Sequence, residues 1–273
     1  MNHYRFPDYQ VAGDADSTVF LLHGAYGAKD YFRAEIETLV RAGYRVVAWD
    51  APGYGISPLP QGGLSIEGLA EAAARLIERE GTARNVVVGH SMGGIAAPLV
   101  TLLAGDKVHG LVISATVASF SRKSEQDKIT FVEERIGPIR RGQPFREAAL
   151  PVIRSMFAPD SKGPLVDLVT EVAAGMRGET FCAAIEAITR YDGEDNLRRV
   201  KVPTLLVAGE ADKVGRPEGM QSLTKLIPNA RFVCIPNAGH YAFAEQPAAF
   251  NDALLGFLDE VMRGRCEPSA VAR

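Results

Sequence analysis

The sequence predicts an α/β protein with a doubly wound, mostly parallel sheet and an inserted helical segment. Short apolar runs alternate with amphipathic helical patterns over most of the chain, which is typical of a parallel sheet covered by helices. Between residues 119 and 195 this alternation stops, and apolar residues recur only at helical spacing. One short Val-rich run, residues 86–88, leads into the residues GHSMGG, which indicates a sharp turn from a strand into a helix.

The expected strands are distributed over both ends of the chain. Residues 9–11 alternate weakly and fit one short edge strand, whereas the other runs are apolar enough to be buried on both faces. The buried strands are expected at residues 18–22, 45–49, 86–88, 109–114, 203–208 and 231–236.

Amphipathic segments separate these strands. The first begins at about Asp30, a residue type that caps helices, and ends at Gly43, which favours a helix C-terminus. The helices expected to cover the sheet comprise residues 30–42, residues 65–81, the segment after residue 91, residues 217–227 and residues 246–262. We therefore assign residues 1–118 and 196–273 to the core, and residues 119–195 to an insertion of four helices.

Composition excludes several classes of protein. The 273 residues carry a net charge of −3 and contain no Lys- or Arg-rich stripe with interleaved aromatic residues, so a nucleic-acid partner is not expected. No stretch approaches the ~20 apolar residues of a membrane span, and the first residues lack the apolar core of a secretion signal. These observations favour a soluble, cytoplasmic protein with no membrane partner.

The cysteines indicate no structural cross-link. Cys182, Cys234 and Cys266 are odd in number, widely spaced and not accompanied by clustered histidines, so neither a disulfide framework nor a zinc site is expected. Cys234 alternates within an apolar strand and is expected to pack in the core, whereas Cys182 falls in a region that could line a pocket. We expect no metal ion and no cofactor.

Ser91 is the candidate nucleophile. Gly89 and Gly93 stand two positions on either side of it, and the missing side chains let the chain reverse without a collision between the turn and neighbouring strands. Ser91 also begins a helix, where free backbone N–H groups favour negative charge. The alternative is a serine that only caps a helix after a Gly-rich turn.

A serine hydroxyl needs a base to remove its proton and an acid to orient that base. His240 is the candidate base, because it follows a strand at the sheet edge where α/β proteins bind ligands, and His3 and His109 are poorer choices. Asp212 also follows a strand, 28 positions before His240, and is the candidate acid. Glu210 is a weaker alternative, and Asp212 could instead form only an Asx turn.

The candidate oxyanion hole consists of two backbone N–H groups. Met92 supplies one at the start of the helix, and Ala25 supplies the other in the loop after a buried strand. His23 precedes this loop and is expected to shape it.

The chain resembles the α/β-hydrolase superfamily, and the resemblance covers almost all of it. The matching pieces are residues 22–24 (LHG), 50–57 (DAPGYGIS), 89–94 (GHSMGG), 203–212 and 238–240 (AGH), in the family's order. The resemblance implies that residues 50–57 form a structural turn and that the helical insertion is a lid over the active site. The short N-terminus departs from the family and puts its first antiparallel strand in doubt.

A serine nucleophile favours hydrolysis of a small carboxylic ester or lactone through an acyl-enzyme. The lid region loosely resembles enol-lactonases and carbon–carbon bond hydrolases of aromatic degradation. Carbon–carbon or amide bond hydrolysis, a perhydrolase side activity, and a ligand receptor with negligible turnover remain alternatives. Three arginines without an intervening acid, Arg140, Arg141 and Arg146, are candidates to meet a carboxylate on the substrate.

Overall fold

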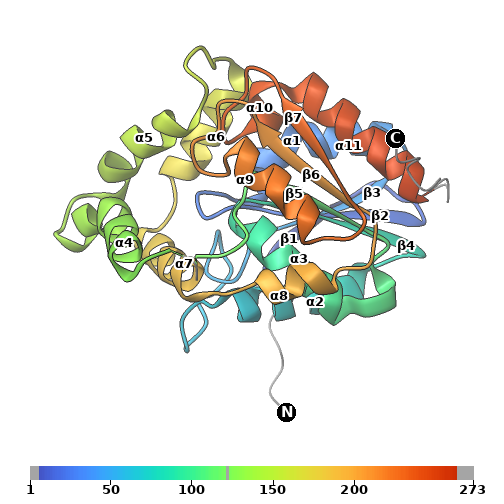
Figure 1. Ribbon diagram of the computed structural model, residues 1–273, viewed down its shortest axis with the longest axis horizontal. Helices are drawn as coiled ribbons and strands as arrows, with labels where there is room; N and C mark the ends of the chain where they lie inside the picture. The colour runs from blue at the N-terminus through green and yellow to red at the C-terminus, as the bar shows by residue number, and fades with distance from the viewer. Residues whose placement is uncertain (1–5, 121–122, 263–273) are drawn as a thin grey trace.

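Seven strands form one sheet at the centre of the computed structural model, which describes residues 6–120 and 123–262 (Figure 1). The strands lie in the order β1-β3-β2-β4-β5-β6-β7. Their bounds are β1 (Tyr9–Ala12), β2 (Ser17–Leu22), β3 (Arg45–Trp49), β4 (Arg84–His90), β5 (Gly110–Ser114), β6 (Thr204–Gly209) and β7 (Ala230–Ile235). Only β1 is antiparallel to its neighbour. The family's first antiparallel strand, which the short N-terminus had put in doubt, is therefore present.

The strand order reverses direction between β2 and β4. From β2 the chain winds one way to β3, and from β4 it winds the other way through β5 and β6 to β7. In an open parallel sheet, such a reversal leaves a crevice at the carboxyl ends of the two central strands. The residues that follow β2 and β4, including Ala25 and Ser91, therefore share this crevice.

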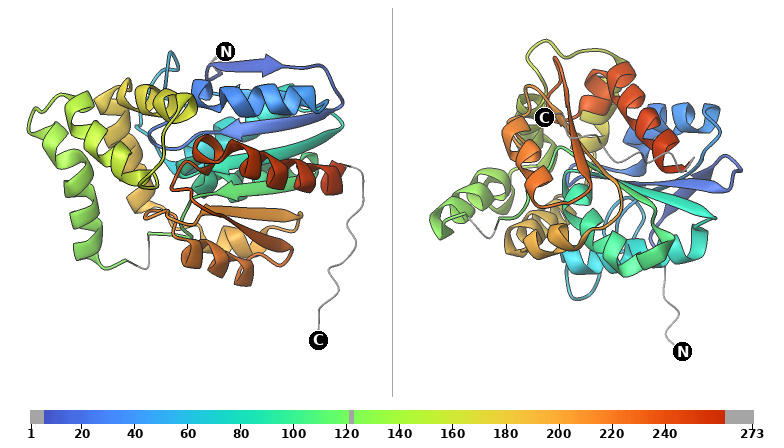
Figure 2. Two further views of the ribbon diagram at one scale, coloured as in Figure 1. Left: turned by 90° about the horizontal axis from the view of Figure 1, so that it is seen from above. Right: turned by 45° about the vertical axis from the view of Figure 1, so that its right-hand side comes forward.

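Helices cover both faces of the sheet, and a separate group of helices lies beyond one end of the strands (Figure 2). The helices of the core are η1 (Lys29–Phe32), α1 (Arg33–Arg41), α2 (Ile66–Glu80), α3 (Met92–Ala104), η2 (Gly105–Lys107), α8 (Glu194–Arg199), α9 (Pro217–Ser222), η3 (Leu223–Lys225), α10 (Ala242–Glu245) and α11 (Pro247–Met262). Helix α1 packs with α11, whereas α2 and α8 pack against α3.

The helical insertion follows β5 and consists of α4 (Glu125–Arg140), α5 (Phe145–Met156), α6 (Pro164–Ala174) and α7 (Gly178–Arg190). These four helices gather at one end of the sheet, and α6 contacts both η1 and α10 of the core (Figure 2). Helix α8 begins at Glu194 and packs on α3, so it spans the expected boundary between residues 195 and 196. No strand forms between β5 and β6 in the described part of this region.

The observed fold confirms the predicted α/β class and its mostly parallel sheet. The expectation that Cys234 packs in the core is wrong. Strand β7 lies at the edge of the sheet and leaves this thiol exposed. Cys182 is partly buried, and Cys266 lies outside the described residues. Within the described part of the chain, no helix combines the length and the apolar character needed to cross a bilayer.

Candidate active site

Ser91 stands at the corner between β4 and α3 with a backbone φ of 52°, in the left-handed region. The corner is possible because both neighbouring glycines lie against backbone. A Cβ on Gly89 would meet the Gly93 carbonyl oxygen at 2.4 Å, and one on Gly93 would meet the Leu22 oxygen at 2.3 Å. The serine side chain is thereby presented at the crevice between β2 and β4.

A cavity of about 660 Å³ opens in front of Ser91, and we call it the central pocket. This volume suits a small organic ligand. From the core, its lining includes Ala25, Tyr26, Tyr31, Ser91, Thr116 and His240. From the helical insertion, it includes Phe120, Phe131, Arg135, Met156, Ile185 and Ile188. The serine and the imidazole thus face one largely apolar space.

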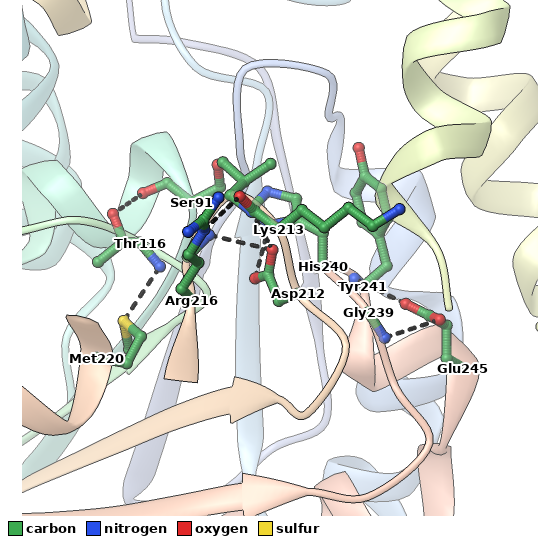
Figure 3. A network of polar contacts seen from close by, with 12 residues as sticks. Ser91, Thr116, Asp212, Lys213, Arg216, Met220, Gly239, His240, Tyr241 and Glu245 are labelled. Carbon is green, nitrogen blue, oxygen red and sulfur yellow. Dashed lines mark hydrogen bonds and ion pairs between the residues drawn. The ribbon is translucent and has the colours of Figure 1, made fainter. Parts of the chain in front are cut away.

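The imidazole of His240 is held by Asp212. Nδ1 of His240 lies 3.0 Å from Oδ2 of Asp212, and both side chains are almost completely buried. Figure 3 shows Asp212, His240 and Ser91 gathered in one cluster of side chains. With a proton on Nδ1, the free Nε2 is the nitrogen available to accept a proton from a hydroxyl.

Asp212 is fixed in its ionised form by several donors. Its Oδ1 accepts hydrogen bonds from the backbone N–H groups of Val214, at 2.7 Å, and Gly215, at 3.1 Å. Burial alone would raise the pKa of Asp212, but His240 and these N–H groups outweigh burial, and the pKa lies below its ordinary value. The Asx turn and the contact with His240 therefore use different oxygens of one carboxylate.

The expected oxyanion donors are close to Ser91, because Met92 follows it in the chain and Ala25 lines the same pocket. Among the described residues, neither the Ala25 nor the Met92 backbone N–H has a hydrogen-bond partner. The Ala25 loop is held by Tyr54, whose hydroxyl donates to the Ala25 carbonyl at 3.1 Å. Two unpaired N–H groups beside a serine can bind a negatively charged oxygen.

His23 shapes this loop. Its Nε2 accepts from the Ala51 N–H at 3.0 Å, so its Nδ1 carries the proton and donates to the Gly24 carbonyl at 2.8 Å. Burial lowers the pKa of His23 to about 4, and the side chain is neutral at pH 7.

Comparison with known proteins identifies the family. A model of the alpha/beta hydrolase family matches residues 19–253, which is most of the chain. The chain belongs to the alpha/beta hydrolase family. The protein is therefore a hydrolase.

Several relatives of this hydrolase have named activities. It is 30% identical over 262 residues to polyketide synthase ThaQ of Burkholderia thailandensis, matching 93% of this chain but only 12% of that protein. It is 26% identical to a pimeloyl-[acyl-carrier protein] methyl ester esterase of Neisseria meningitidis, covering 90% of this chain and 80% of the relative. A thermophilic esterase structure from Thermogutta terrifontis superposes with a TM-score of 0.82 at 27% identity, covering 93% of both chains.

The three arginines proposed to meet a substrate do not line the central pocket. Arg140 pairs with Glu186 at 2.5 Å, Arg141 pairs with Glu133, and Arg146 pairs with Glu171 at 2.8 Å. All three side chains are at least half exposed. Arg140 ends α4, Arg141 follows it and Arg146 lies on α5. Because all three are exposed and none lines the central pocket, we withdraw them as substrate ligands.

Glu245 is a residue of the hydrolase site that sequence reasoning missed. Its Oε2 accepts from the backbone N–H groups of Gly239, at 2.9 Å, and Ala158, at 2.8 Å, and from the Ser161 hydroxyl. Its Oε1 accepts from the Tyr241 N–H at 3.0 Å (Figure 3). One carboxylate thus clamps both neighbours of His240 and joins their loop to the helical insertion.

Three further pocket residues were also missed. The hydroxyl of Thr116 donates to the Ser91 carbonyl at 2.9 Å, which braces the serine corner (Figure 3). His90 is buried beside His240, with ring centroids 4.9 Å apart, and neither of its ring nitrogens has a partner among the described residues. Arg135 lies over the ring of Phe131, which stands four positions earlier on α4. Residues at this spacing are neighbours on a helix, so the sequence could have indicated that the two side chains stack.

Proposed function

We propose that this protein is a serine hydrolase that cleaves small carboxylic esters or lactones through an acyl-enzyme. The observation that carries the proposal is the 3.0 Å contact between His240 Nδ1 and Asp212 Oδ2, behind an imidazole that shares the central pocket with Ser91. The esterase names of relatives that are 26% and 27% identical support the same class of reaction.

In the proposed reaction, Nε2 of His240 takes the proton of the Ser91 hydroxyl while Oγ bonds to the carbonyl carbon. The carbonyl oxygen becomes an oxyanion and accepts hydrogen bonds from the Ala25 and Met92 N–H groups. The bond to the alcohol oxygen then breaks, and the imidazolium gives its proton to that oxygen.

The acyl group remains on Ser91 as an ester. His240 next takes a proton from water, whose oxygen attacks the acyl carbon, and the second oxyanion uses the same two N–H groups. Collapse of this intermediate returns the proton to Ser91 Oγ and releases the carboxylic acid. Throughout both halves, Asp212 stays ionised and keeps the imidazole oriented.

In this proposal the insertion, residues 119–195, is a lid. Seven residues that line the central pocket come from it: Phe120, Lys123, Phe131, Arg135, Met156, Ile185 and Ile188. A cover of this kind excludes water and strengthens the electrostatic contacts made to the oxyanion.

The test is a panel of ethyl and p-nitrophenyl esters, lactones, amides and carbon–carbon bond substrates. We expect a burst followed by steady turnover on esters or lactones, which would exclude a receptor without turnover. The Ser91→Ala, His240→Gln and Asp212→Asn variants should each lower kcat by about 10³-fold or more. The proposal fails if Ser91→Ala retains activity within tenfold of the wild type, or if only amides or carbon–carbon bonds are cleaved.

A further inference from the structure

The lining of the central pocket is cationic. Four of its residues are positively charged, namely Lys123, Arg135, Lys213 and Arg216, and Glu218 is its one carboxylate. None of the four cations makes an ion pair with another described residue. This excess is local, because the whole chain has a net charge of −3.

Arg135 differs from the other three because it is only partly exposed. It projects from α4 into the lining, and its guanidinium carbon lies 3.7 Å from the centroid of the Phe131 ring. Phe131 in turn packs on Phe120, with 4.6 Å between ring centroids. The stacking fixes the plane of the guanidinium but uses none of its five N–H donors.

A second unpaired donor faces the same space. Tyr26 follows the proposed oxyanion donor Ala25 and is 7% exposed, with its ring 4.2 Å from that of Phe181, centroid to centroid. Its hydroxyl has no hydrogen-bond partner among the described residues. Tyr26 and Arg135 both line the central pocket.

Unpaired donors and charges removed from water are unfavourable unless something binds them. Four exposed arginines of the same insertion, Arg140, Arg141, Arg146 and Arg190, each have a glutamate partner. Arg135 has none, although it is the more buried. The group that would satisfy both Arg135 and Tyr26 is an acceptor with two oxygens and a negative charge.

We infer that Arg135, with the Tyr26 hydroxyl, forms an anion subsite in the central pocket, and that the preferred substrates are esters that also carry a carboxylate. The inference rests on the proposed ester hydrolysis. The planar fork of Arg135 matches a carboxylate in a bidentate arrangement. Lys123, Lys213 and Arg216 are exposed at the rim and attract the same charge toward the pocket.

The test compares kcat/KM for charged and neutral esters of equal length. One arm uses monoethyl esters of dicarboxylic acids against ethyl esters of monocarboxylic acids, and places the carboxylate on the acyl side. The other arm uses acetyl esters of hydroxy acids against acetyl esters of simple alcohols, and places it on the alcohol side. We expect a preference of about tenfold to a hundredfold for the charged ester in one arm.

The variants separate this subsite from general effects on the fold. Arg135→Ala should abolish the preference, Arg135→Lys should restore part of it, and Tyr26→Phe should reduce it. Arg140→Ala, on the same helix but exposed and paired, should leave the preference unchanged.

Two negative results have different meanings. Equal rates on charged and neutral esters in both arms, or a preference that survives Arg135→Ala, would overturn the anion subsite while ester hydrolysis stands. Absence of turnover on every ester would overturn the proposed function itself.

Discussion

Ser91 adopts a φ of 52° that an L residue rarely takes, and this strain is part of the corner that exposes its hydroxyl. The Ser91→Ala and Ser91→Gly variants both lack the hydroxyl but differ in the Cβ. We expect Ser91→Gly to be the more stable by about 1 kcal/mol, measured by urea unfolding, because glycine tolerates positive φ. Equal or lower stability of Ser91→Gly would show that the corner is not strained.

Glu35, on α1, is a buried carboxyl remote from the proposed chemistry. Burial raises its pKa from 4.5 to about 8 against opposing hydrogen bonds from its backbone and from Asn251. Its Oε1 and the Asn251 Oδ1 have no partner among the described residues. A proton on Glu35 would supply a donor for this pair.

The raised pKa of Glu35 predicts a pH dependence of stability. Between pH 4.5 and about 8 the unfolded chain releases this proton while the folded chain keeps it, so the free energy of unfolding falls as pH rises. Glu35→Gln removes this contribution. The stability of the variant relative to wild type should therefore grow by about 3 kcal/mol from pH 5 to pH 8. Parallel stability curves would contradict the assignment.

Among single residues, those that directly follow strands could be predicted from the sequence. Ser91, Asp212 and His240 could be chosen because a parallel sheet brings the carboxyl ends of its strands to one edge. Arg135 could not be separated from Arg140 in this way, because both lie on α4 and only the packing of that helix decides which one faces the pocket.

At the element scale, the loop between β7 and α10 depends on Glu245, which we describe as a positioning residue for His240. Glu245→Gln replaces an acceptor oxygen by a donor that faces N–H groups. We expect kcat to fall about tenfold to a hundredfold with little change in KM, because the imidazole of His240 is displaced while the residues that line the central pocket stay in place. The rate of Ser91 labelling by a fluorophosphonate should fall in parallel.

The control for this prediction is Glu171→Gln. Glu171 lies on α6 and forms an exposed ion pair with Arg146, of a kind that contributes little to stability. Its removal should change neither kcat nor the labelling rate. If Glu245→Gln lowers the stability but leaves kcat and the labelling rate of Ser91 at their wild-type values, Glu245 has only a structural role.

The elements themselves were predicted with uneven success. Strand β3 occupies the expected residues 45–49, because its apolar run is bounded by polar and turn residues. The expected helix at residues 30–42 instead begins as the 3₁₀ turn η1, and α8, with six residues, is too short to show a period.

For the whole molecule, the contrast between a negative chain and a cationic pocket predicts a salt effect. Raising the ionic strength from about 0.02 M to about 0.5 M shortens the Debye length several-fold and screens the exposed rim cations. The kcat/KM of the charged ester should therefore fall several-fold, while that of the neutral ester stays constant. Equal salt dependence of the two esters would contradict a role for the rim cations in attraction.

The arrangement of the insertion over the sheet was the least predictable feature. Helical periodicity identified residues 119–195 as helical, but it contains no information on which faces meet the core. The contact is made by particular groups, such as the Met156 carbonyl that accepts from the His240 N–H at 2.8 Å. Gly239 permits this approach, since a Cβ there would lie 2.4 Å from the same oxygen.

In the proposed reaction Ser91 is the nucleophile and His240 activates it. The most direct test of these two roles is mass spectrometry of the protein after reaction with a fluorophosphonate. We predict one stoichiometric adduct on the peptide that contains Ser91, with labelling slowed about 10³-fold in His240→Gln. An adduct on another residue, or equally fast labelling of Ser91 without the imidazole, would contradict the account.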